Sequence, residues 1–364
     1  MRTGLKHILI ICPYPENRAP SQRLKYEQYF SSWRNEGFKI EVSSFVSIAL
    51  WSKLYIKGHW YIKIFQTLKG YYNRIKDLKR LPKYDIIYIS LWVTPFGWPL
   101  FEYLFYKRNK NIIYDIDDLV YLGHSSKANR YFKIIKGQKK MPYLMAKAKH
   151  VIVCTPMLEA YARKFNSLVS DISSTINTDI YVPVNTYTQS NPIVLGWSGS
   201  HSTAPYLKLL APVLLRLAKV RNFKLIVMGD ANFNIDGLQQ IQALDWSEEI
   251  ELKTLQSFDI GLYPLPDEPW VHGKSGLKAL QYMALGIPAI ATAIGANYRI
   301  IEHGISGILV HNEDEWFYQL CKLIDNAAYR KQIGLAGRTC VEAYYSVNAN
   351  KAHYLKILNT LANG

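Results

Sequence analysis

The stretch Gly273–Thr292 reads GKSGLKALQYMALGIPAIAT and contains a complete helix–turn–strand unit. Apolar residues recur at helical spacing in its first half, which predicts a helix over Ser275–Leu285 with one buried stripe. Gly286 and Pro288 end that helix, because glycine favours a helix C-terminus and proline cannot continue a helix. The short apolar run Ala289–Thr292 then predicts a buried strand. Helix, tight turn and buried strand form the repeating unit of a parallel α/β sheet.

The same alternation continues on both sides of this unit, and it predicts an α/β protein with doubly wound parallel sheets. A polar run over residues 183–192 interrupts the pattern, and it divides the chain into domains over residues 1–185 and 186–345. Residues 346–364 are expected to form a helix that packs back on the N-terminal domain. The other predicted strands are His7–Cys12, Lys39–Ser44, Tyr84–Leu91, Asn111–Tyr114, His150–Thr155, Ile193–Trp197, Phe223–Met228, Asp259–Tyr263 and Gly307–Val310, and the other predicted helices are Ser21–Glu36, Phe96–Lys107, Pro156–Phe165 and Ala204–Val220.

Composition limits the class of protein. With 364 residues, 49% of them hydrophobic, the chain is long enough for two globular domains. No window reaches the ~18 uninterrupted apolar residues that a membrane span requires. The N-terminal apolar run ends at Pro13 and is too short for a signal sequence. The 4 cysteines lie far apart without metal-binding spacing, so we expect a cytoplasmic protein.

The formal net charge of +16 implies an anionic partner. Much of the excess lies in Trp51–Lys83, where nine Lys or Arg residues accompany one acidic residue, Asp77. Aromatic residues are interleaved with them, and this mixture is typical of proteins that rest on an anionic membrane surface, here the inner face of the plasma membrane. The alternatives are a solvated helical face and a nucleic-acid site. Because the chain has no recognisable nucleic-acid-reading motif, we expect no nucleic-acid partner.

Lys274 and Lys278 lie four residues apart at the start of the predicted helix, which places both on one helix face. Free N–H groups already make a helix N-terminus positive, so each lysine there costs ~0.3–1 kcal/mol. A bound anion removes that cost. Together with the backbone at Gly273 and Ser275, the two ammonium groups form a candidate diphosphate site. The alternative is a pair of solvated lysines on an exposed helix start.

Gly273–Thr292, followed by Gly295–Asn297 and Ile301–Gly307, resembles the donor-binding region of GT-B glycosyltransferases of family 4. The resemblance implies a GT-B fold, in which two Rossmann-like, doubly wound domains face each other across a cleft. It also implies that the C-terminal domain binds a nucleotide-diphosphate sugar and that the N-terminal domain binds the acceptor. Further segments that match the family in the same order are Cys12–Pro15, Tyr114–Asp118, Thr175–Asp179 and Gly196–Ser200.

The resemblance assigns roles to individual residues of the C-terminal half. Gln281 occupies the position of a family glutamate that accepts hydrogen bonds from the donor ribose, and its amide carbonyl can still accept them. Gly273 occupies the position of another glutamate, so the usual acidic contact to the donor sugar is missing. Glu302 is the better carboxylate for the donor, because its Glu-x-Gly context matches the family.

Two more candidate sites follow predicted strands. Asp117 best matches the family position that faces the donor sugar, and a capping or ion-paired structural role is the alternative. The carboxylates of Asp115–Asp118 could suggest a divalent metal, but the family generally works without one, and we expect no cofactor. The N–H groups of Gly199 and Ser200 are candidates for contacts with the donor phosphates, and the alternative there is an ordinary strand–helix turn.

On the acceptor side, the loop after the first strand offers Arg18, Ser21 and Arg23 in place of the glycine pair that is usual in the family. The resemblance as a whole implies a retaining glycosyltransferase of the hexosyltransferase type. Its acceptor would be a glycan or a lipid-linked sugar in surface polysaccharide or glycoconjugate synthesis. Two other functions remain open: another GT-B enzyme, such as a sugar-nucleotide epimerase, and a non-catalytic protein that binds glycans or lipids.

Overall fold

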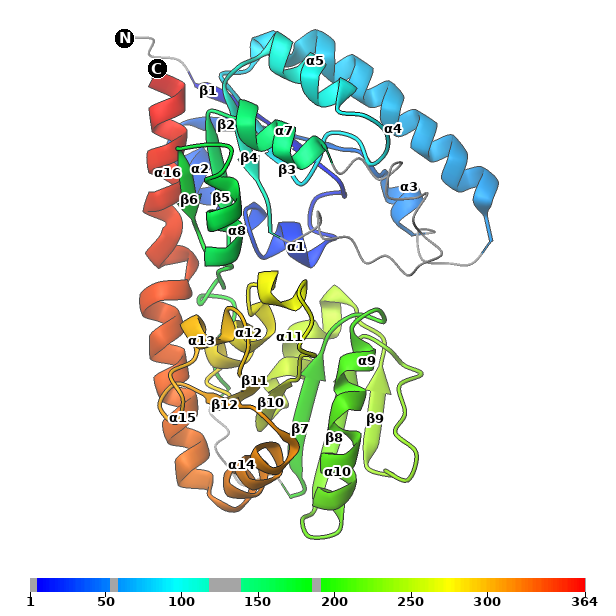
Figure 1. Cartoon of the computed structure of the whole chain (residues 1–364), viewed down its shortest axis with the longest axis vertical. Helices are drawn as coiled ribbons and strands as arrows, with labels where there is room; N and C mark the ends of the chain where they lie inside the picture. Colours follow the sequence, from blue (N-terminus) through cyan, green and yellow to red (C-terminus); the bar gives the residue numbers. More distant parts are fainter. Residues whose placement is uncertain (1–4, 53–57, 118–138, 185–190, 364) are drawn as a thin grey trace. The chain divides into compact units, whose positions relative to one another are not determined.

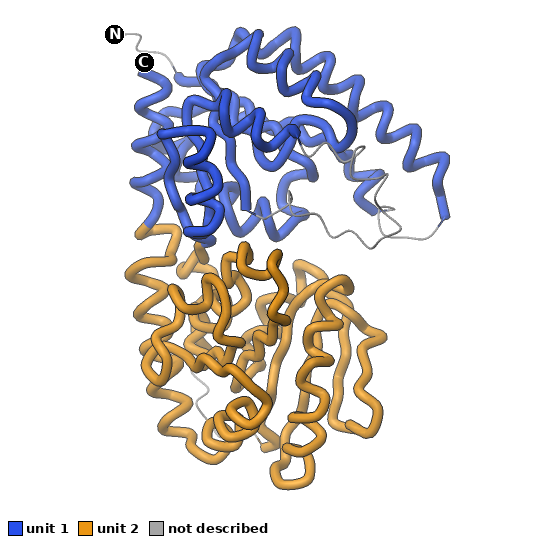
Figure 2. Tube along the Cα trace, viewed as in Figure 1, with its two compact units in different colours: residues 1–174, 350–364 blue, residues 175–349 orange. Residues whose placement is uncertain are grey.

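The computed structural model describes residues 5–52, 58–117, 139–184 and 191–363 (Figure 1). The chain divides into two compact units (Figure 2). Unit 1 comprises Met1–Ser174 together with Asn350–Gly364, and unit 2 comprises Thr175–Ala349. No helix in the described ranges is long and apolar enough to span a membrane.

The described part of unit 1 is built on a parallel 6-stranded sheet with the order β2-β1-β3-β4-β5-β6. Its inner strands are continuous apolar runs, as expected for strands that are buried on both faces. The strands are β1 (Lys6–Cys12), β2 (Phe38–Ser44), β3 (Ile86–Ser90), β4 (Ile112–Asp115), β5 (His150–Val153) and β6 (Val169–Asp171). The helices are α1 (Pro20–Arg23), α2 (Phe30–Asn35), α3 (Ile48–Trp51), α4 (Trp60–Arg80), α5 (Leu100–Arg108), α7 (Lys140–Lys147) and α8 (Pro156–Ala162).

The described part of unit 2 contains a second parallel 6-stranded sheet, with the order β12-β11-β10-β7-β8-β9. The strands are β7 (Ile193–Ser198), β8 (Phe223–Met228), β9 (Ile241–Leu244), β10 (Ile260–Tyr263), β11 (Ala289–Thr292) and β12 (Ile308–Val310). The helices are α9 (Ala204–Leu207), α10 (Ala211–Ala218), α11 (Glu248–Gln256), α12 (Leu277–Ala284), α13 (Asn297–Ile300), α14 (Glu313–Asp325), α15 (Ala327–Cys340) and α16 (Val347–Asn363), the last of which extends into unit 1.

The two sheets confirm the predicted α/β, doubly wound fold class, but two predicted helices are wrong as continuous elements. The one over Ser21–Glu36 is divided into α1, a 3-10 turn and α2. There the side chains of Gln22 and Glu27 turn inward and hydrogen-bond the loop after β1. The one over Ala204–Val220 is divided by a 3-10 turn, because Pro212 at the start of α10 has no N–H to continue the helical ladder.

Several elements of the structure were not predicted, among them the strands β6 and β9 and the helices α3, α4, α7, α11 and α13. The strands β6 and β9 lie at sheet edges and have little burial, so neither shows a clear apolar pattern. The helices α7 and α11 are short, with 8 and 9 residues, and their charged residues obscure the helical spacing. Edge strands and short helices take their structure mainly from packing against neighbours, which local sequence does not report.

Residues Thr175–Val184 belong to unit 2, although the sequence analysis placed them in the first domain. Arg338 of α15 donates hydrogen bonds to the carbonyl oxygens of Thr178 and Tyr181 in this segment. The polar run over residues 183–192 therefore does not mark the boundary, which lies at Ser174 because the chain beyond it is bonded to unit 2.

The part of α16 from Asn350 onward belongs to unit 1. Its Tyr354 is buried against two aromatic rings, with centroid distances of 4.5 Å to Tyr29 and 5.6 Å to Trp33. Tilted aromatic pairs of this kind add to the stabilisation that their buried area provides.

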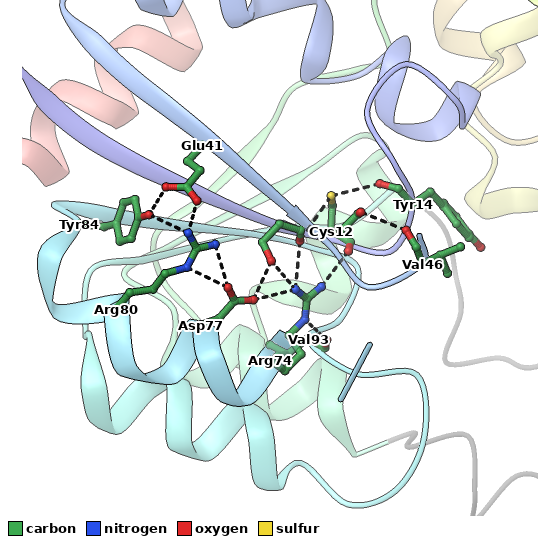
Figure 3. Close-up of polar contacts among 11 residues, drawn as sticks. Cys12, Tyr14, Glu41, Val46, Arg74, Asp77, Arg80, Tyr84 and Val93 are labelled. Atoms are coloured by element: carbon green, nitrogen blue, oxygen red, sulfur yellow. Dashed lines mark hydrogen bonds and ion pairs between the residues drawn. The ribbon is translucent and has the colours of Figure 1, made fainter. Parts of the chain in front are cut away.

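A buried guanidinium joins α4 to the carboxyl ends of the strands of unit 1 (Figure 3). Arg74 is 0% exposed, and its Nη2 donates to the Cys12 carbonyl at the end of β1 (2.9 Å). Its Nη1 donates to the Ser43 carbonyl in β2 (3.1 Å), and its Nε donates to the Val93 carbonyl after β3 (2.8 Å). The Asp77 carboxylate completes the site at 2.9 Å from Nη1. Every bonded partner is fixed, so α4 cannot turn about its axis without breaking this network.

We predict that Arg74→Met lowers the free energy of unfolding by about 3–5 kcal/mol, because it removes one of the two cations paired with the buried Asp77 carboxylate and leaves three backbone carbonyl groups without their donor. Urea denaturation measures the loss. Arg163→Met is the matched control: its ion pair with Glu159 is exposed, so the loss should stay below about 1 kcal/mol. Equal losses for the two variants would contradict the role assigned to Arg74.

Candidate functional site

The strand order of unit 2 places a crevice at the carboxyl ends of β7 and β10. From β7 the chain builds outward to β8 and β9 on one side, and β10 then starts the other side of the sheet. Connections that leave two neighbouring strands in opposite directions open a crevice at the strand ends, which is where ligands bind in open α/β sheets. The segments that follow these two strands contain Gly199, Ser200, Lys274 and Lys278.

The loop after β7 satisfies its own backbone groups. The Gly199 N–H donates to the Met228 carbonyl (2.9 Å), and the Ser200 N–H donates to Thr203 Oγ1 (3.1 Å). The Thr203 hydroxyl in turn donates to the Ser200 carbonyl (3.1 Å). A phosphate contact at Ser200 therefore requires that the ligand replace Thr203, and the Gly199 N–H is held by the neighbouring strand. The donor-phosphate role of both residues stays a prediction.

Lys278 lies in the crevice between the two strands. Its Nζ is 4.8 Å from the ring centroid of Trp197 in β7 and 5.6 Å from that of Tyr263 at the end of β10. The same atom lies 3.5 Å from Thr203 Oγ1. Burial, and secondly the positive charge of Lys274, lower the pKa of Lys278 from 10.5 to about 7. The crevice therefore contains a lysine whose protonated form a bound anion would stabilise.

Lys274 precedes the helix and does not share a helix face with Lys278, so the prediction of a common face was wrong. It adopts an extended conformation between the 3-10 turn Val271–Gly273 and α12, which begins only at Leu277. Its Nζ lies over the ring of Trp270, 4.6 Å from the centroid. The Lys274 ammonium still acts on Lys278. Its positive charge is the second cause, after burial, of the lowered pKa of Lys278.

The start of α12 has the features of an anion site. Its N-cap, Gly276, adopts a left-handed conformation (φ 74°), and no side chain caps the first turn. The first turn also lacks an acidic residue. A Cβ at Gly276 would be strained by this positive φ and would also lie 2.3 Å from Cδ1 of Ile300 in α13, so glycine is favoured at this turn. Gly273 N–H donates to Trp270, and Ser275 lies half-buried between Gly273 and the helix.

Gln281 is buried in a polar cluster that the sequence did not indicate. Its Nε2 donates to the hydroxyl of Tyr181 (3.1 Å) and to the carboxylate of Glu251 in α11 (3.1 Å). A glutamate at position 281 would bring two carboxylates together at this distance. The amide is therefore the residue type that fits beside Glu251, and its carbonyl oxygen keeps its acceptor capacity.

Glu302 lies in the turn between α13 and β12 with an exposed side chain. Its N–H donates to Ser306 Oγ (2.9 Å). The pKa of Cys340 is raised first by the burial of that thiol and secondly by the negative charge of the Glu302 carboxylate. Among the described residues, no hydrogen bond or ion pair joins this carboxylate to Lys274 or Lys278. Its contact with the donor stays a prediction.

In unit 1, the acidic segment after β4 separates into buried and half-buried carboxylates. Asp115 pairs with Lys25 (2.5 Å) and accepts a hydrogen bond from Tyr88. Burial alone would lower the pKa of Lys25, but the Asp115 carboxylate more than offsets this and raises it. Asp117 is half-buried at the strand end, and Asp118 lies outside the described residues. Within the described ranges, no three His, Cys, Asp or Glu side chains form a group that could hold a metal ion.

The predicted acceptor residues surround the loop after β1. Arg18 and Ser21 are exposed, and Arg23 is half-buried. Gln22 and Glu27 support the loop from inside: Gln22 bonds both backbone groups of Tyr14, and Glu27 accepts from the Asn17 N–H. The loop is thus held at the carboxyl end of β1, beside β3, where the strand order of this sheet also changes direction.

Sequence reasoning missed several residues of the unit 2 site. Thr203 and Glu251 carry no local signal, because their partners lie 75 and 30 positions away in the chain. Trp270 extends the site beyond the lysines, with its ring 5.6 Å from that of Tyr206. An aromatic residue four positions before Lys274 was visible in the sequence, but its stacking on the lysine was not.

Comparisons with known proteins agree with this geometry. Residues 193–326 match the family model described as "Glycosyl transferases group 1". The chain is similar to sucrose-phosphate synthase from Thermosynechococcus elongatus, with a TM-score of 0.71, 15% identity, and coverage of 98% of this chain and 99% of the other. It is similar to HepE from Anabaena in complex with UDP-glucose, with a TM-score of 0.71, 14% identity, and coverage of 97% and 99%. It is also similar to the apo form of the lipopolysaccharide outer core galactosyltransferase WaaB, with a TM-score of 0.65, 14% identity, and coverage of 97% of this chain and 99% of the other. Residues 193–326 are thus similar to the group 1 glycosyl transferases, and the chain has the GT-B fold.

We predict that Gln281→Glu destabilises the protein by about 1–3 kcal/mol, because it places a second carboxylate in a buried cluster beside Glu251. The double variant Glu251→Gln/Gln281→Glu exchanges the acid and the amide and should recover most of the loss. Urea denaturation of the two single variants and the double variant gives the coupling. Strict additivity of the two single losses would rule out the contact.

The lowered pKa of Lys278 predicts a pH dependence of stability. Between about pH 7 and pH 10.5 the unfolded chain binds a proton at Lys278 that the folded chain does not, so stability rises with pH in this window. The free energy of unfolding of the wild type, relative to Lys278→Met, should therefore increase from pH 7 to pH 10. Lys219→Met, a change at an exposed lysine, is the control. A difference that does not change with pH would refute the lowered pKa.

Proposed function

We propose that this protein is a glycosyltransferase that moves a sugar from a nucleotide-diphosphate donor to a glycan or lipid-linked acceptor, with retention of the anomeric configuration. The pathway that we propose is the synthesis of a surface polysaccharide or glycoconjugate. The observation that carries the proposal is the pair Lys274 and Lys278 beside the uncapped start of α12. Two ammonium groups near first-turn helix N–H groups suit a ligand with two adjacent phosphates.

The leaving diphosphate is the species that these groups stabilise. Negative charge builds up on it as the bond to the sugar breaks, and cations held in a half-buried site act on that charge more strongly than they would in water. Lys278 gains a proton as the anion binds, because the ligand charge offsets the burial that lowers its pKa. Since two lysines can supply the positive charge, we propose a mechanism without a metal ion.

The remaining donor contacts follow from the positions of the polar groups. The amide nitrogen of Gln281 is occupied by Tyr181 and Glu251, so we assign the ribose hydroxyls to its carbonyl oxygen. Ser200 and Ser275 are proposed phosphate contacts, and Asp117 is proposed to face the donor sugar. In a retaining transfer, the acceptor hydroxyl attacks from the face that the diphosphate leaves.

The relatives support a sugar nucleotide as donor and a glycan as acceptor. HepE was solved with UDP-glucose, and WaaB is a galactosyltransferase of the lipopolysaccharide outer core. We therefore propose a hexose donor and use UDP as the first probe, within a panel of nucleoside diphosphates.

An anionic membrane surface is the proposed partner of Trp51–Lys83, of which residues 53–57 lie outside the described ranges. Lys69, Lys76 and Lys79 are exposed on α4, whereas Asp77 is buried and paired with Arg74 and Arg80. The exposed charges of this helix are therefore positive, and their attraction to anionic lipid weakens with salt. We propose a cytoplasmic protein that is peripheral on the inner face of the plasma membrane.

We predict that Lys278→Ala lowers donor turnover by about 10²–10³-fold and that Lys274→Ala lowers it less, because Lys278 is the more buried of the two cations. Turnover is measured as UDP release from UDP-hexoses, and UDP affinity by thermal shift. Lys219→Ala, on an exposed surface, is the control.

Three outcomes distinguish the functions. Full turnover and affinity in both lysine variants would overturn the phosphate site. An isomerised sugar from donor alone would indicate an epimerase. If no nucleoside diphosphate in the panel shifts the melting temperature of the wild type, the chain is a binding protein without this donor.

A further inference from the structure

The long helix α4 has 21 residues, and two of its three buried residues are charged, unlike the apolar stripe that an ordinary surface helix buries. Its buried residues are Gly70, Arg74 and Asp77, and the half-buried Tyr71 and Leu78 pack against the apolar cores on the same side. Gly70 allows the helix to approach closely, since a Cβ there would lie 2.8 Å from the Phe45 ring. Arg74 and Asp77 hydrogen-bond the strand ends (Figure 3).

The opposite side of α4 carries an exposed apolar stripe. Its members recur three and four residues apart and are between 47% and 66% exposed. Surface apolar residues are common one at a time, but a continuous row of them marks an interaction site. In Figure 1, α4 extends along the outside of unit 1 next to α5. The α4 stripe consists of Tyr61, Ile64, Phe65, Leu68, Tyr72 and Ile75.

Lysines lie beside the exposed aromatic rings of this region. Lys76 Nζ is 4.6 Å from the centroid of Tyr72 in the stripe. The same pairing recurs near α5, where Lys107 lies over Tyr103 at 5.4 Å. Lysines beside half-exposed rings match the headgroup level of a bilayer, where the rings sit at the boundary and the ammonium groups meet lipid phosphates.

We propose that the α4 stripe inserts into the interface of an anionic lipid bilayer, so that α4 lies in the membrane plane with Arg74 and Asp77 toward the protein. This inference rests on the membrane contact proposed above and deepens it. In the membrane contact proposed above, lysines attract the protein to the lipid surface. In the present inference, the apolar side chains of the α4 stripe also hold the protein there, because they are buried at the boundary between headgroups and acyl chains. The two contributions differ in their response to salt, because screening weakens charge attraction and does not weaken apolar burial.

Charge favours a bilayer over a second copy of this chain as the occupant. Two stripes facing each other would bring the exposed Lys69 and Lys76 of both copies together, with no exposed acidic residue on the described part of α4 to offset them. Anionic headgroups supply the missing charge. The buried Arg74 also prevents α4 from turning its apolar face inward, so the exposure of the stripe is built into the fold.

The test is binding of the full chain to vesicles of phosphatidylcholine with and without phosphatidylglycerol, at about 0.1 M and about 1 M NaCl, where the Debye length falls from ~10 Å to ~3 Å. The stripe variant is Phe65→Gln/Leu68→Gln, since glutamine is compatible with a helix. The lysine variant is Lys69→Gln/Lys76→Gln. The matched control is Tyr318→Gln/Leu335→Gln, which changes two exposed apolar residues on helices of unit 2.

The stripe variant should lose at least about tenfold in partition coefficient at both salt concentrations, which corresponds to ~1.4 kcal/mol. The lysine variant should be weaker only at low salt, and the control should bind as the wild type does. All variants should keep the thermal shift with UDP.

Wild-type binding by the stripe variant would overturn the inference. The inference would also be overturned if the wild type formed a dimer that did not bind vesicles and the stripe substitutions dissociated that dimer, because a second copy would then cover the stripe. If the stripe variant loses vesicle binding while UDP shifts no variant, including the wild type, insertion stands and the donor proposal fails.

Discussion

The guanidinium of Arg74 fixes the arrangement of unit 1. This one buried cation donates to three backbone carbonyl groups at or just beyond the carboxyl ends of the strands, those of Cys12, Ser43 and Val93. Burying a charge is costly unless it is paired and fully hydrogen-bonded, and Asp77 supplies the pair. The same residue therefore closes the strand ends and sets which side of α4 faces solvent. The loops at these strand ends are positioned as a consequence.

In unit 2 the corresponding role belongs to the crevice between β7 and β10. The strand order creates it, and Lys278 occupies it between the rings of Trp197 and Tyr263. Thr203 links this lysine to the backbone of Ser200 through hydrogen bonds to its hydroxyl oxygen. The strand order thus determines where the crevice lies, and the residue types determine which groups line it.

Sequence predicted the parts of this molecule that local pattern controls. The inner strands were found because strands buried on both faces must be continuously apolar, and the helix–turn–strand unit at Gly273–Thr292 was found because its turn residues are specific. The buried charges of α4, the split helix at Ser21–Glu36 and the Gln281–Glu251 pair were not found, since each depends on contacts between distant residues. The lysines were recognised, but the start of their helix was misplaced, because Gly276 in a left-handed conformation gives no pattern in the sequence.

The lowered pKa of Lys278 also gives the crevice a way to discriminate among anions. A site with two permanent positive charges would hold chloride, carboxylates and inorganic phosphate in any salt solution. Because its pKa is lowered to about 7 by burial and then by the charge of Lys274, Lys278 takes up its positive charge less readily than an exposed lysine does. An anion of single charge repays little of that cost, whereas a ligand with adjacent phosphates offsets it. In the proposed donor site, this cost would favour a nucleoside diphosphate over abundant small anions.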